Sequence, residues 1–193
     1  MPFRNVGSKA YKAVLIGDGT VGKTSIRRSY LGENFKSNHL PTIGVDFAQK
    51  WISFNGHSVR FVIWDLAGQP SFERVRQHYY VGSHGIFLVY SVVDRESFDN
   101  AAKWLVEAYK YMGTLPPTVV VGNKIDLRNG SPNGTYLTKE DGFEFVDIFN
   151  RKLDVPAVYV ETSALTGENI NIAFQEILRM MSNYDYRDEE EPS

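Results

Sequence analysis

The feature that most constrains this chain is the stretch Gly17–Thr24, which reads G-D-G-T-V-G-K-T and follows the apolar run Ala13–Ile16. In a G-x-x-x-x-G-K-T loop the backbone N–H groups turn inward, the lysine reaches phosphates, and the threonine hydroxyl can ligate Mg²⁺. The next segment, Ser25–Leu31, is predicted to be a helix whose positive end faces the same phosphates. A glycine-rich turn with a solvated lysine is the alternative, and the flanking strand and helix argue against it. The predicted phosphate-binding residues are Gly17, Asp18, Gly19, Thr20, Val21, Gly22, Lys23, Thr24 and Ser25.

Length and composition indicate one folded domain of an ordinary globular class. The chain has 193 residues, of which 42% are hydrophobic and 23% are charged, and its net charge is -2. This small charge gives no electrostatic reason to expect a nucleic-acid partner. The sequence contains no cysteine, which excludes disulfides, thiolate metal sites, thiol catalysis and lipid anchors attached through sulfur.

The two ends of the sequence give no sign of membrane attachment. Residues 1–5 lack the apolar core of a signal peptide, and no window approaches the ~18 apolar residues of a membrane span. We expect a cytoplasmic, monomeric protein without a lipid anchor of its own, unless a native tail has been removed. The expected organisation is a flexible leader over 1–10, a globular domain over 11–182 and an acidic disordered tail over 183–193.

Apolar runs alternate with helical patterns along the chain, which predicts an α/β fold. Asn55-Gly56 separates two strand-like runs and is a strong hairpin signal. The remaining strands alternate with helices, which implies a doubly wound parallel sheet. The predicted fold class is therefore a six-stranded, mostly parallel sheet with one antiparallel edge strand and helices on both faces. The predicted strands are Tyr11–Ile16, Val45–Phe54, Ser58–Asp65, Gly85–Val92, Thr118–Gly122 and Ala157–Val160.

The segments between these strands carry helical patterns. Ser71–Tyr80 is weakly helical, and a longer helix is predicted over Arg95–Met112. A capping-box-like pair, Thr138 and Asp141, begins a further helix, and apolar residues at helical spacing between 170 and 181 predict a last one. The apolar face expected for the helix over 95–112 consists of Phe98, Ala101, Ala102, Leu105, Tyr109 and Met112.

Polar residues at the carboxyl end of the third predicted strand indicate metal and water chemistry. Asp65 ends this strand within W-D-L-A-G-Q, at the edge where ligands bind in open α/β sheets. Its carboxylate can hold Mg²⁺ through a water, and the Gly68 N–H can approach a γ-phosphate because no side chain intervenes. Gln69 offers one acceptor and two donors, which suits the positioning of an attacking water.

The sequence N-K-I-D after the fifth predicted strand indicates recognition of guanine. A carboxylate at Asp126 can accept two hydrogen bonds from the N1–H and the 2-amino group of guanine, whereas adenine would leave it buried and unpaired. Asn123 can brace neighbouring loops, and the stem of Lys124 can lie over the ring. N-K-x-D alone is a common surface turn, but it is a much stronger signal after a phosphate loop and a D-x-x-G sequence.

Five motifs in order, G-D-G-T-V-G-K-T, P-T-I-G-V-D-F, W-D-L-A-G-Q, N-K-I-D and E-T-S-A, resemble those of the Ras superfamily of small GTPases. The resemblance is greatest to the Rab branch and spans Tyr11–Ser182. It implies a P-loop NTPase G domain that binds GTP, GDP and Mg²⁺ and hydrolyses GTP slowly. It also implies a molecular switch with effectors, exchange factors and GTPase-activating proteins as partners. Switch I would include Thr42, and switch II would run from Gly68 to Tyr80.

The resemblance assigns roles to further residues of the site. Thr42 would close on Mg²⁺ and the γ-phosphate in the triphosphate state. The expected metal ligands are Thr24, Thr42 and Asp65. The expected catalytic residues are Gln69, Lys23 and Thr42. The expected base-binding residues, besides those of N-K-I-D, are Phe35, Ser163, Ala164 and Leu165, and a place in the core is the alternative for Phe35.

The sequence departs from the family pattern in three places. Leu66 stands where threonine is usual, Pro70 stands where glutamate is typical, and the chain ends without the cysteines that become prenylated. Because Pro70 disfavours a helical backbone at Gln69, a nucleotide-loaded binding module that hardly turns over is one alternative function. A P-loop ATPase or kinase is another, and Asp126 argues against it.

The charge needed for hydrolysis suggests that a partner takes part. Residues 32–44 contain no arginine to stabilise the negative charge of phosphoryl transfer, so we expect slow hydrolysis that a partner accelerates with an arginine. Arg74 or Arg76 in the predicted switch II could supply this charge instead. Phe47, Trp64 and Tyr79 match the aromatic cluster that lies under the Rab effector face, although they could simply belong to the core.

Overall fold

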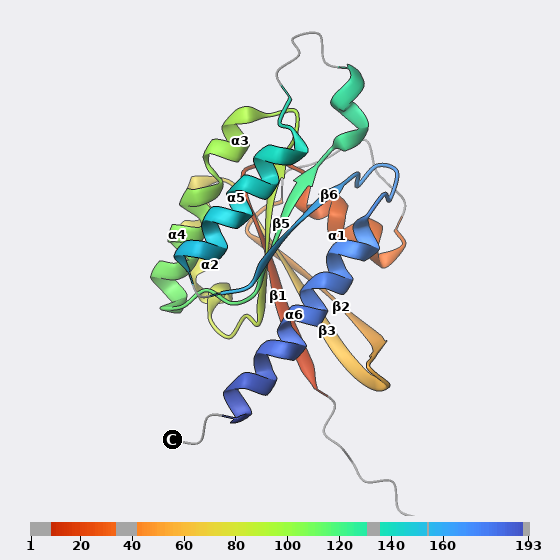
Figure 1. The fold of residues 1–193 in the computed structure, drawn as a ribbon, viewed down its shortest axis with the longest axis vertical. Coiled ribbons are helices and arrows are strands. Elements are labelled where there is room, and N and C mark those ends of the chain that lie inside the picture. The colour runs from red at the N-terminus through yellow and green to blue at the C-terminus, as the bar shows by residue number, and fades with distance from the viewer. Residues whose placement is uncertain (1–8, 34–41, 131–135, 154, 191–193) are drawn as a thin grey trace, which may run out of the picture.

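The computed structural model describes residues 9–33, 42–130, 136–153 and 155–190. Its six strands form one sheet in the order β2-β3-β1-β4-β5-β6, in which only the β2–β3 pair is antiparallel (Figure 1). This arrangement confirms the predicted fold class. The strands are β1 (Ala10–Ile16), β2 (Val45–Phe54), β3 (His57–Leu66), β4 (Gly85–Ser91), β5 (Thr118–Asn123) and β6 (Ala157–Thr162).

Helices cover both faces of the sheet. In Figure 1, α1 and α6 lie against one face, and α2, α3, α4 and α5 lie against the other. The two short 3₁₀ helices, η1 and η2, follow β3 and β5. The helices are α1 (Lys23–Leu31), α2 (Glu73–Tyr80), α3 (Arg95–Asp99), α4 (Ala101–Met112), α5 (Lys139–Lys152) and α6 (Ile170–Glu190), with η1 over Pro70–Phe72 and η2 over Ile125–Gly130.

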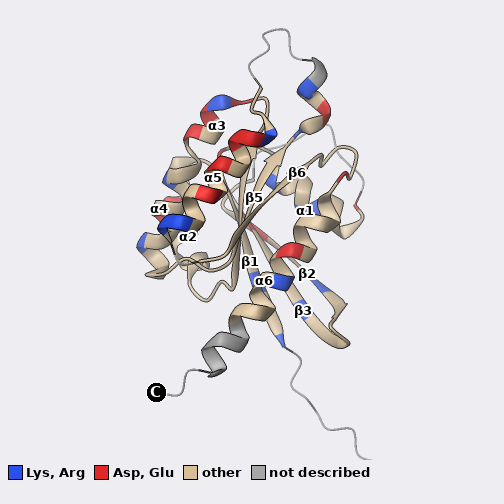
Figure 2. Cartoon of the chain, in the orientation of Figure 1, with Lys and Arg blue, Asp and Glu red and all other residues tan. Residues whose placement is uncertain are grey.

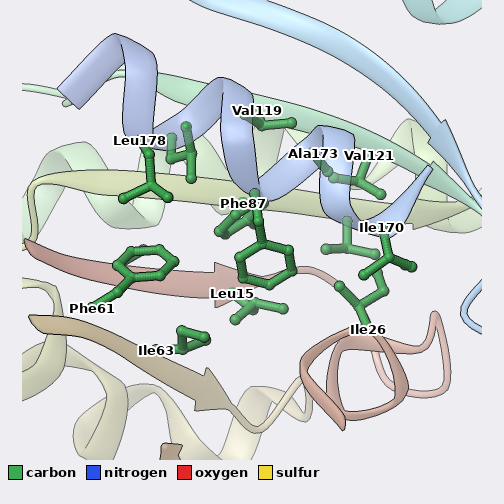
Figure 3. Close-up of a cluster of buried hydrophobic side chains, with 14 of the residues drawn as sticks. Leu15, Ile26, Phe61, Ile63, Phe87, Val119, Val121, Ile170, Ala173 and Leu178 are labelled. Carbon is green, nitrogen blue, oxygen red and sulfur yellow. The ribbon is translucent and has the colours of Figure 1, made fainter. Parts of the chain in front are cut away.

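The central strands are buried on both faces, as their near-continuous apolar sequences predict. Every residue of β4 and β5 is buried, and neither strand carries a charged residue (Figure 2). On the α6 side, the ring of Phe174 stacks on Tyr30 at 3.7 Å and lies 4.6 Å from the ring of Phe87. Figure 3 shows Leu15 and Phe87 of the sheet in one cluster of buried apolar side chains with Ala173 and Leu178 of α6. These contacts fix α6 and α1 against the sheet.

The β2–β3 hairpin has the turn that its sequence predicts. Asn55 and Gly56 both adopt positive φ, 49° and 77°, which is the pattern of a type I′ turn. Phe54 pairs with His57 directly across it. The turn fixes the register of β2 on β3, and therefore the place of Asp46 opposite Asp65 at the other end of the hairpin.

The single helix expected over Arg95–Met112 is wrong, because the structure has two helices that meet at Asn100. The side chain of Asn100 donates to the carboxylate of Asp18 at 2.8 Å, a contact with a residue 82 positions earlier. The expected apolar face is also wrong in part, since Tyr109 is 55% exposed while Trp104 is buried. The face that packs on the sheet consists of Ala101, Trp104, Leu105 and Ala108.

The C-terminal segment expected to be disordered from residue 183 is helical up to Glu190, because α6 continues through it. Once a helix has begun, each added residue gains one backbone hydrogen bond, so a helix anchored by a packed first half extends readily. None of the helices in the described residues is long and apolar enough to cross a membrane. Residues 1–8 lie outside the described chain, so the flexible leader stays a prediction.

Phe174→Ala should lower the free energy of unfolding by about 3–5 kcal/mol, because the buried ring leaves a cavity between α6 and the sheet. Ile172→Ala is the matched control on the same helix, since Ile172 is 48% exposed, and it should change stability by less than about 1 kcal/mol. Urea denaturation at one fixed nucleotide concentration measures both. Equal losses in the two variants would contradict this account of the core.

Candidate functional site

A pocket of about 500 Å³ opens at the carboxyl ends of β1, β3 and β5. The residues that line it come from all five of the sequence motifs described above. Leu66, Ala67 and Leu127 also line the pocket, although the sequence analysis did not predict them as site residues. Their positions next to Asp65 and Asp126 in the sequence could have indicated this. The lining residues are Gly19, Thr20, Gly22, Lys23, Thr24, Ser25, Thr42, Leu66, Ala67, Gly68, Gln69, Asn123, Lys124, Asp126, Leu127, Ala164 and Leu165.

Lys23 is the first residue of α1 and closes the phosphate loop on itself. Its ammonium donates to the backbone oxygens of Gly17 and Asp18, each at 2.7 Å. Burial lowers the pKa of Lys23 to about 8, and Asp65 and Asp18 act against this shift. The amine is therefore fixed at the pocket wall, where an anionic ligand would favour its charged form.

The carboxylate of Asp18 points away from the predicted phosphate position and binds the helices on the other side. It accepts from Asn100 Nδ2 at 2.8 Å and from Trp104 Nε1 at 2.6 Å. No local pattern predicts these two partners, because both lie more than 80 residues away. Their hydrogen bonds keep a negative charge from turning toward bound phosphates.

The three residues expected to hold a metal lie together. The Thr24 hydroxyl donates to Asp65 Oδ2, and the Thr42 hydroxyl is 2.9 Å from Thr24 Oγ1. Burial raises the pKa of Asp65, and hydrogen bonding from Thr24 acts against this shift. Oδ1 of Asp65 is buried with no hydrogen-bond partner, so it is free to bind a metal or a metal-bound water.

This donor set fits Mg²⁺. The ion takes oxygen ligands, usually one or two carboxylates together with waters and phosphate oxygens. The described residues contain no group of three or more acidic or histidine side chains that could hold a metal by themselves. A site with one carboxylate and two hydroxyls therefore suits an ion that arrives with a phosphate ligand.

Gly68 lets the start of the predicted switch II approach the phosphate loop closely. A Cβ on this residue would lie 2.5 Å from the Gly19 nitrogen and 2.5 Å from the Asp18 carbonyl carbon. Gln69, which follows it, has an extended backbone with φ −80° and ψ 141°, as the proline at position 70 predicts. Gln69 Oε1 is buried without a hydrogen-bond partner, and the side chain lines the pocket.

At the opposite end of the pocket, Asn123 joins three loops. Its Nδ2 donates to Val21 O at 2.9 Å, and its Oδ1 accepts from Thr162 Oγ1 and Ala164 N, each at 3.1 Å. These bonds tie the phosphate loop to the loop after β6. The predicted bracing role of this asparagine therefore has a specific geometry.

Lys124 and Asp126 of the N-K-I-D sequence also line the pocket, whereas Ile125 packs against the hydrophobic core. Asp126 Oδ1 accepts from the Ser163 hydroxyl at 2.5 Å, which fixes its carboxylate. Lys124 has a positive φ of 69°, and burial lowers its pKa. Phe35, the aromatic residue expected beside the base, lies outside the described residues.

Comparison with known proteins identifies the family. The sequence profile of the Ras family matches residues 12–183 of this chain. The chain belongs to the Ras family of small GTPases. It is 36% identical over 171 residues to the GTP-binding protein YPT1 of Saccharomyces cerevisiae, covering 89% of this chain and 78% of that protein. It is 35% identical over 164 residues to the GTP-binding protein YPTM2 of Zea mays, covering 85% and 76%. The predicted resemblance to Rab-like members of the family is confirmed.

In this Ras-family protein, both the backbone conformation of Gly22 and its contact with Asn123 require a glycine. Its φ is 105°, and a Cβ would lie 2.3 Å from Asn123 Nδ2. Alanine would therefore meet backbone strain and also break the asparagine's bond to the phosphate loop.

Gly22→Ala should lower the free energy of unfolding by about 2–4 kcal/mol, as the sum of that strain and an unsatisfied buried amide. Gly19→Ala is the control, because a Cβ there meets nothing within 4 Å, and it should change stability by less than about 0.5 kcal/mol. Urea denaturation at fixed GDP and Mg²⁺ compares them. A Gly22→Ala protein as stable as the parent would show that Asn123 does not constrain the loop.

Proposed function

We propose that this protein is a molecular switch that binds GTP or GDP with Mg²⁺, hydrolyses GTP, and engages effectors through switch I and switch II in its GTP state. One observation carries the proposal. A single pocket in a Ras-family chain is lined by the buried Lys23, by the hydroxyl-bearing Thr24 and Thr42, and by Asp126, and Thr24 donates to the buried Asp65 carboxylate. Extraction of the bound nucleotide, followed by single-turnover hydrolysis of loaded [γ-³²P]GTP, tests it. Recovery of adenine nucleotides, or no phosphate release, would reject it.

Guanine selectivity is proposed to come from Asp126. The carboxylate would accept from the N1–H and 2-amino groups of guanine, and its bond from Ser163 holds it ready. Ala164 and Leu165 line the pocket beside it, so the loop after β6 can support the base. Family membership and this donor pattern both favour guanine over the adenine of an ATPase or kinase.

Phosphate binding is proposed to use Lys23 and the phosphate loop. Lys23 would exchange its two backbone acceptors for phosphate oxygens or share its protons with them. Thr24, Thr42 and Asp65 would hold Mg²⁺, which supplies positive charge to the β- and γ-phosphate oxygens when bound. Lys23 adds a second positive charge on the same side.

Hydrolysis is proposed to depend on Gln69, which would orient the attacking water. Its unpaired Oε1 in the pocket can accept a hydrogen bond from that water. The charge of the transition state still needs a further cation, and Arg76 is already paired with Glu107 while Arg74 is exposed. We therefore propose that a GTPase-activating partner supplies an arginine. Open space beside Gly19 leaves room for its approach.

Effector binding is proposed to use the aromatic residues of β2, β3 and α2. The ring of Phe47 stacks on Trp64 at 4.9 Å, and Trp64 lies 4.8 Å from Tyr79. Phe47 is more than half exposed, so this cluster reaches the surface rather than forming only core. Because Tyr79 of the cluster belongs to the proposed switch II, the affinity of a partner bound there would depend on the position of that segment. A monomeric, cytoplasmic protein remains part of the proposal.

Asp126→Asn should weaken GDP binding at least about a hundredfold, because two hydrogen bonds to a charged acceptor are lost. Xanthosine diphosphate should bind better than to the parent, since an amide can donate to the carbonyl at C2. Competition between the two diphosphates by calorimetry measures the change. Asp147→Asn, on the surface of α5, is the control. An unchanged preference for GDP would mean that Asp126 does not contact the base.

Gln69→Leu should slow single-turnover GTP hydrolysis about tenfold or more while leaving GDP affinity nearly unchanged, because water is no longer oriented. Gln77→Leu, at a half-buried position of α2 that does not line the pocket, is the matched control and should hydrolyse GTP at the parent rate. Phosphate release from loaded protein measures both. Parent-like hydrolysis in Gln69→Leu would remove this residue from the proposed mechanism.

A further inference from the structure

We propose that Arg76 is a positioning residue for GTP hydrolysis, which holds the Gln69 backbone in place by a buried ion pair with Glu107 on α4. The inference rests on the proposed function, because it concerns the glutamine assigned there to the attacking water. It gives switch II a fixed anchor on α4. It also gives Arg76 a task other than supplying charge to the phosphates.

Arg76 binds the backbone on both sides of Gly68, the residue before Gln69. Its Nη1 donates to Ala67 O at 2.9 Å and to Gln69 O at 2.7 Å, so it joins the carbonyls on either side of Gly68. The side chain is only 1% exposed. One guanidinium nitrogen thus fixes the backbone of Gly68 and Gln69. Gly68 is the residue that lies against the phosphate loop.

The other two nitrogens of Arg76 fix the guanidinium. Nε donates to Glu107 Oε1 and Nη2 to Glu107 Oε2, both at 2.7 Å, which is a bidentate pair. The Tyr80 hydroxyl donates to the same carboxylate at 2.8 Å. Only arginine has a planar fork that can satisfy a carboxylate and still donate to two carbonyls, and a lysine ammonium could not span them.

The same anchor reaches the phosphate loop through Trp104. The guanidinium carbon of Arg76 lies 4.6 Å from the indole ring centre, and the indole N–H donates to the Asp18 carboxylate at 2.6 Å. The backbone oxygen of Asp18 in turn accepts from Lys23. Gln69 and the phosphate loop are therefore joined by one continuous group of side chains, in which Arg76 of α2 contacts Glu107 and Trp104 of α4.

Loss of this anchor should affect chemistry more than binding. The pocket's base end, Asn123 and Asp126, has no contact with Arg76 among the described hydrogen bonds. A shift of about 1 Å in the water-positioning residue can cost up to ~100-fold in rate. Removal of Arg76 alone would leave the Glu107 carboxylate, which is only 16% exposed, without its cation, so the substitution has to remove both charges.

The test compares Arg76→Gln/Glu107→Gln with the parent. The two amides can bond to each other and leave no unpaired charge, and the glutamine at position 76 is shorter than arginine and lacks its fork of donors. We expect single-turnover hydrolysis to fall about tenfold and GDP affinity to stay within about twofold. In the Gln69→Leu background the same pair should cause no further loss of rate, because Arg76 acts through Gln69. A structural role alone would not produce this non-additivity.

Lys110→Gln is the matched control, because it removes the exposed ion pair between α4 and Glu73 on α2 without touching Ala67 or Gln69. It should hydrolyse GTP at the parent rate. A folded double amide variant with the parent rate would overturn the inference, and so would an equal loss in the Gln69→Leu background. If the parent itself released no phosphate, the proposed function would fail instead, which the same assay distinguishes.

Discussion

The burial of the central parallel strands on both faces is the constraint on which the site depends. β4 and β5 lie wholly between two layers of helix, where an unpaired polar side chain would be costly. Polar residues such as Asn123 and Asp65 therefore occur where the strands end, and parallel strands end on the same side. The polar residues of the site therefore lie at one edge of the sheet, because the buried middle of the sheet would leave them without hydrogen-bond partners.

The residues that surround the pocket are held by bonds between segments rather than within them. Asn123 joins the phosphate loop to the loop after β6, and Arg76 joins the backbone at Ala67 and Gln69 to Glu107 on α4. In each case a single side chain uses all of its polar atoms on different parts of the chain. The loops around Asn123 are therefore tied to one another, while α2 is held to α4 by two ion pairs, Arg76–Glu107 and Glu73–Lys110.

The parts of the fold that the sequence predicts are those with a local signal. Asn55-Gly56 dictates its turn, apolar runs dictate the buried strands, and Pro70 dictates the extended backbone of Gln69. The break between α3 and α4 has no such signal, because it involves Asn100 bonding to Asp18 across the fold. The helical C-terminal segment was mispredicted because an acidic composition hides the influence of the packed helix before it.

The lack of a local signal also explains why the contacts of Arg76 in the site were not predicted. The motif residues could be placed at one edge because each follows a predicted strand. The pairing of Arg76 with Glu107 could not, since the two residues are 31 positions apart on separate helices and neither belongs to a motif. From periodicity alone, Tyr109 is predicted to face the sheet. In the structure Trp104 is buried instead, in contact with Asp18 and Arg76.

The place of Trp104 has an optical consequence. An indole emits at wavelengths and intensities that depend on nearby charges and on access to water. This one donates to a carboxylate of the phosphate loop and faces a guanidinium of switch II. A change in the separation of those two segments alters the electric field across the ring, so the protein carries a built-in fluorophore at the junction between them.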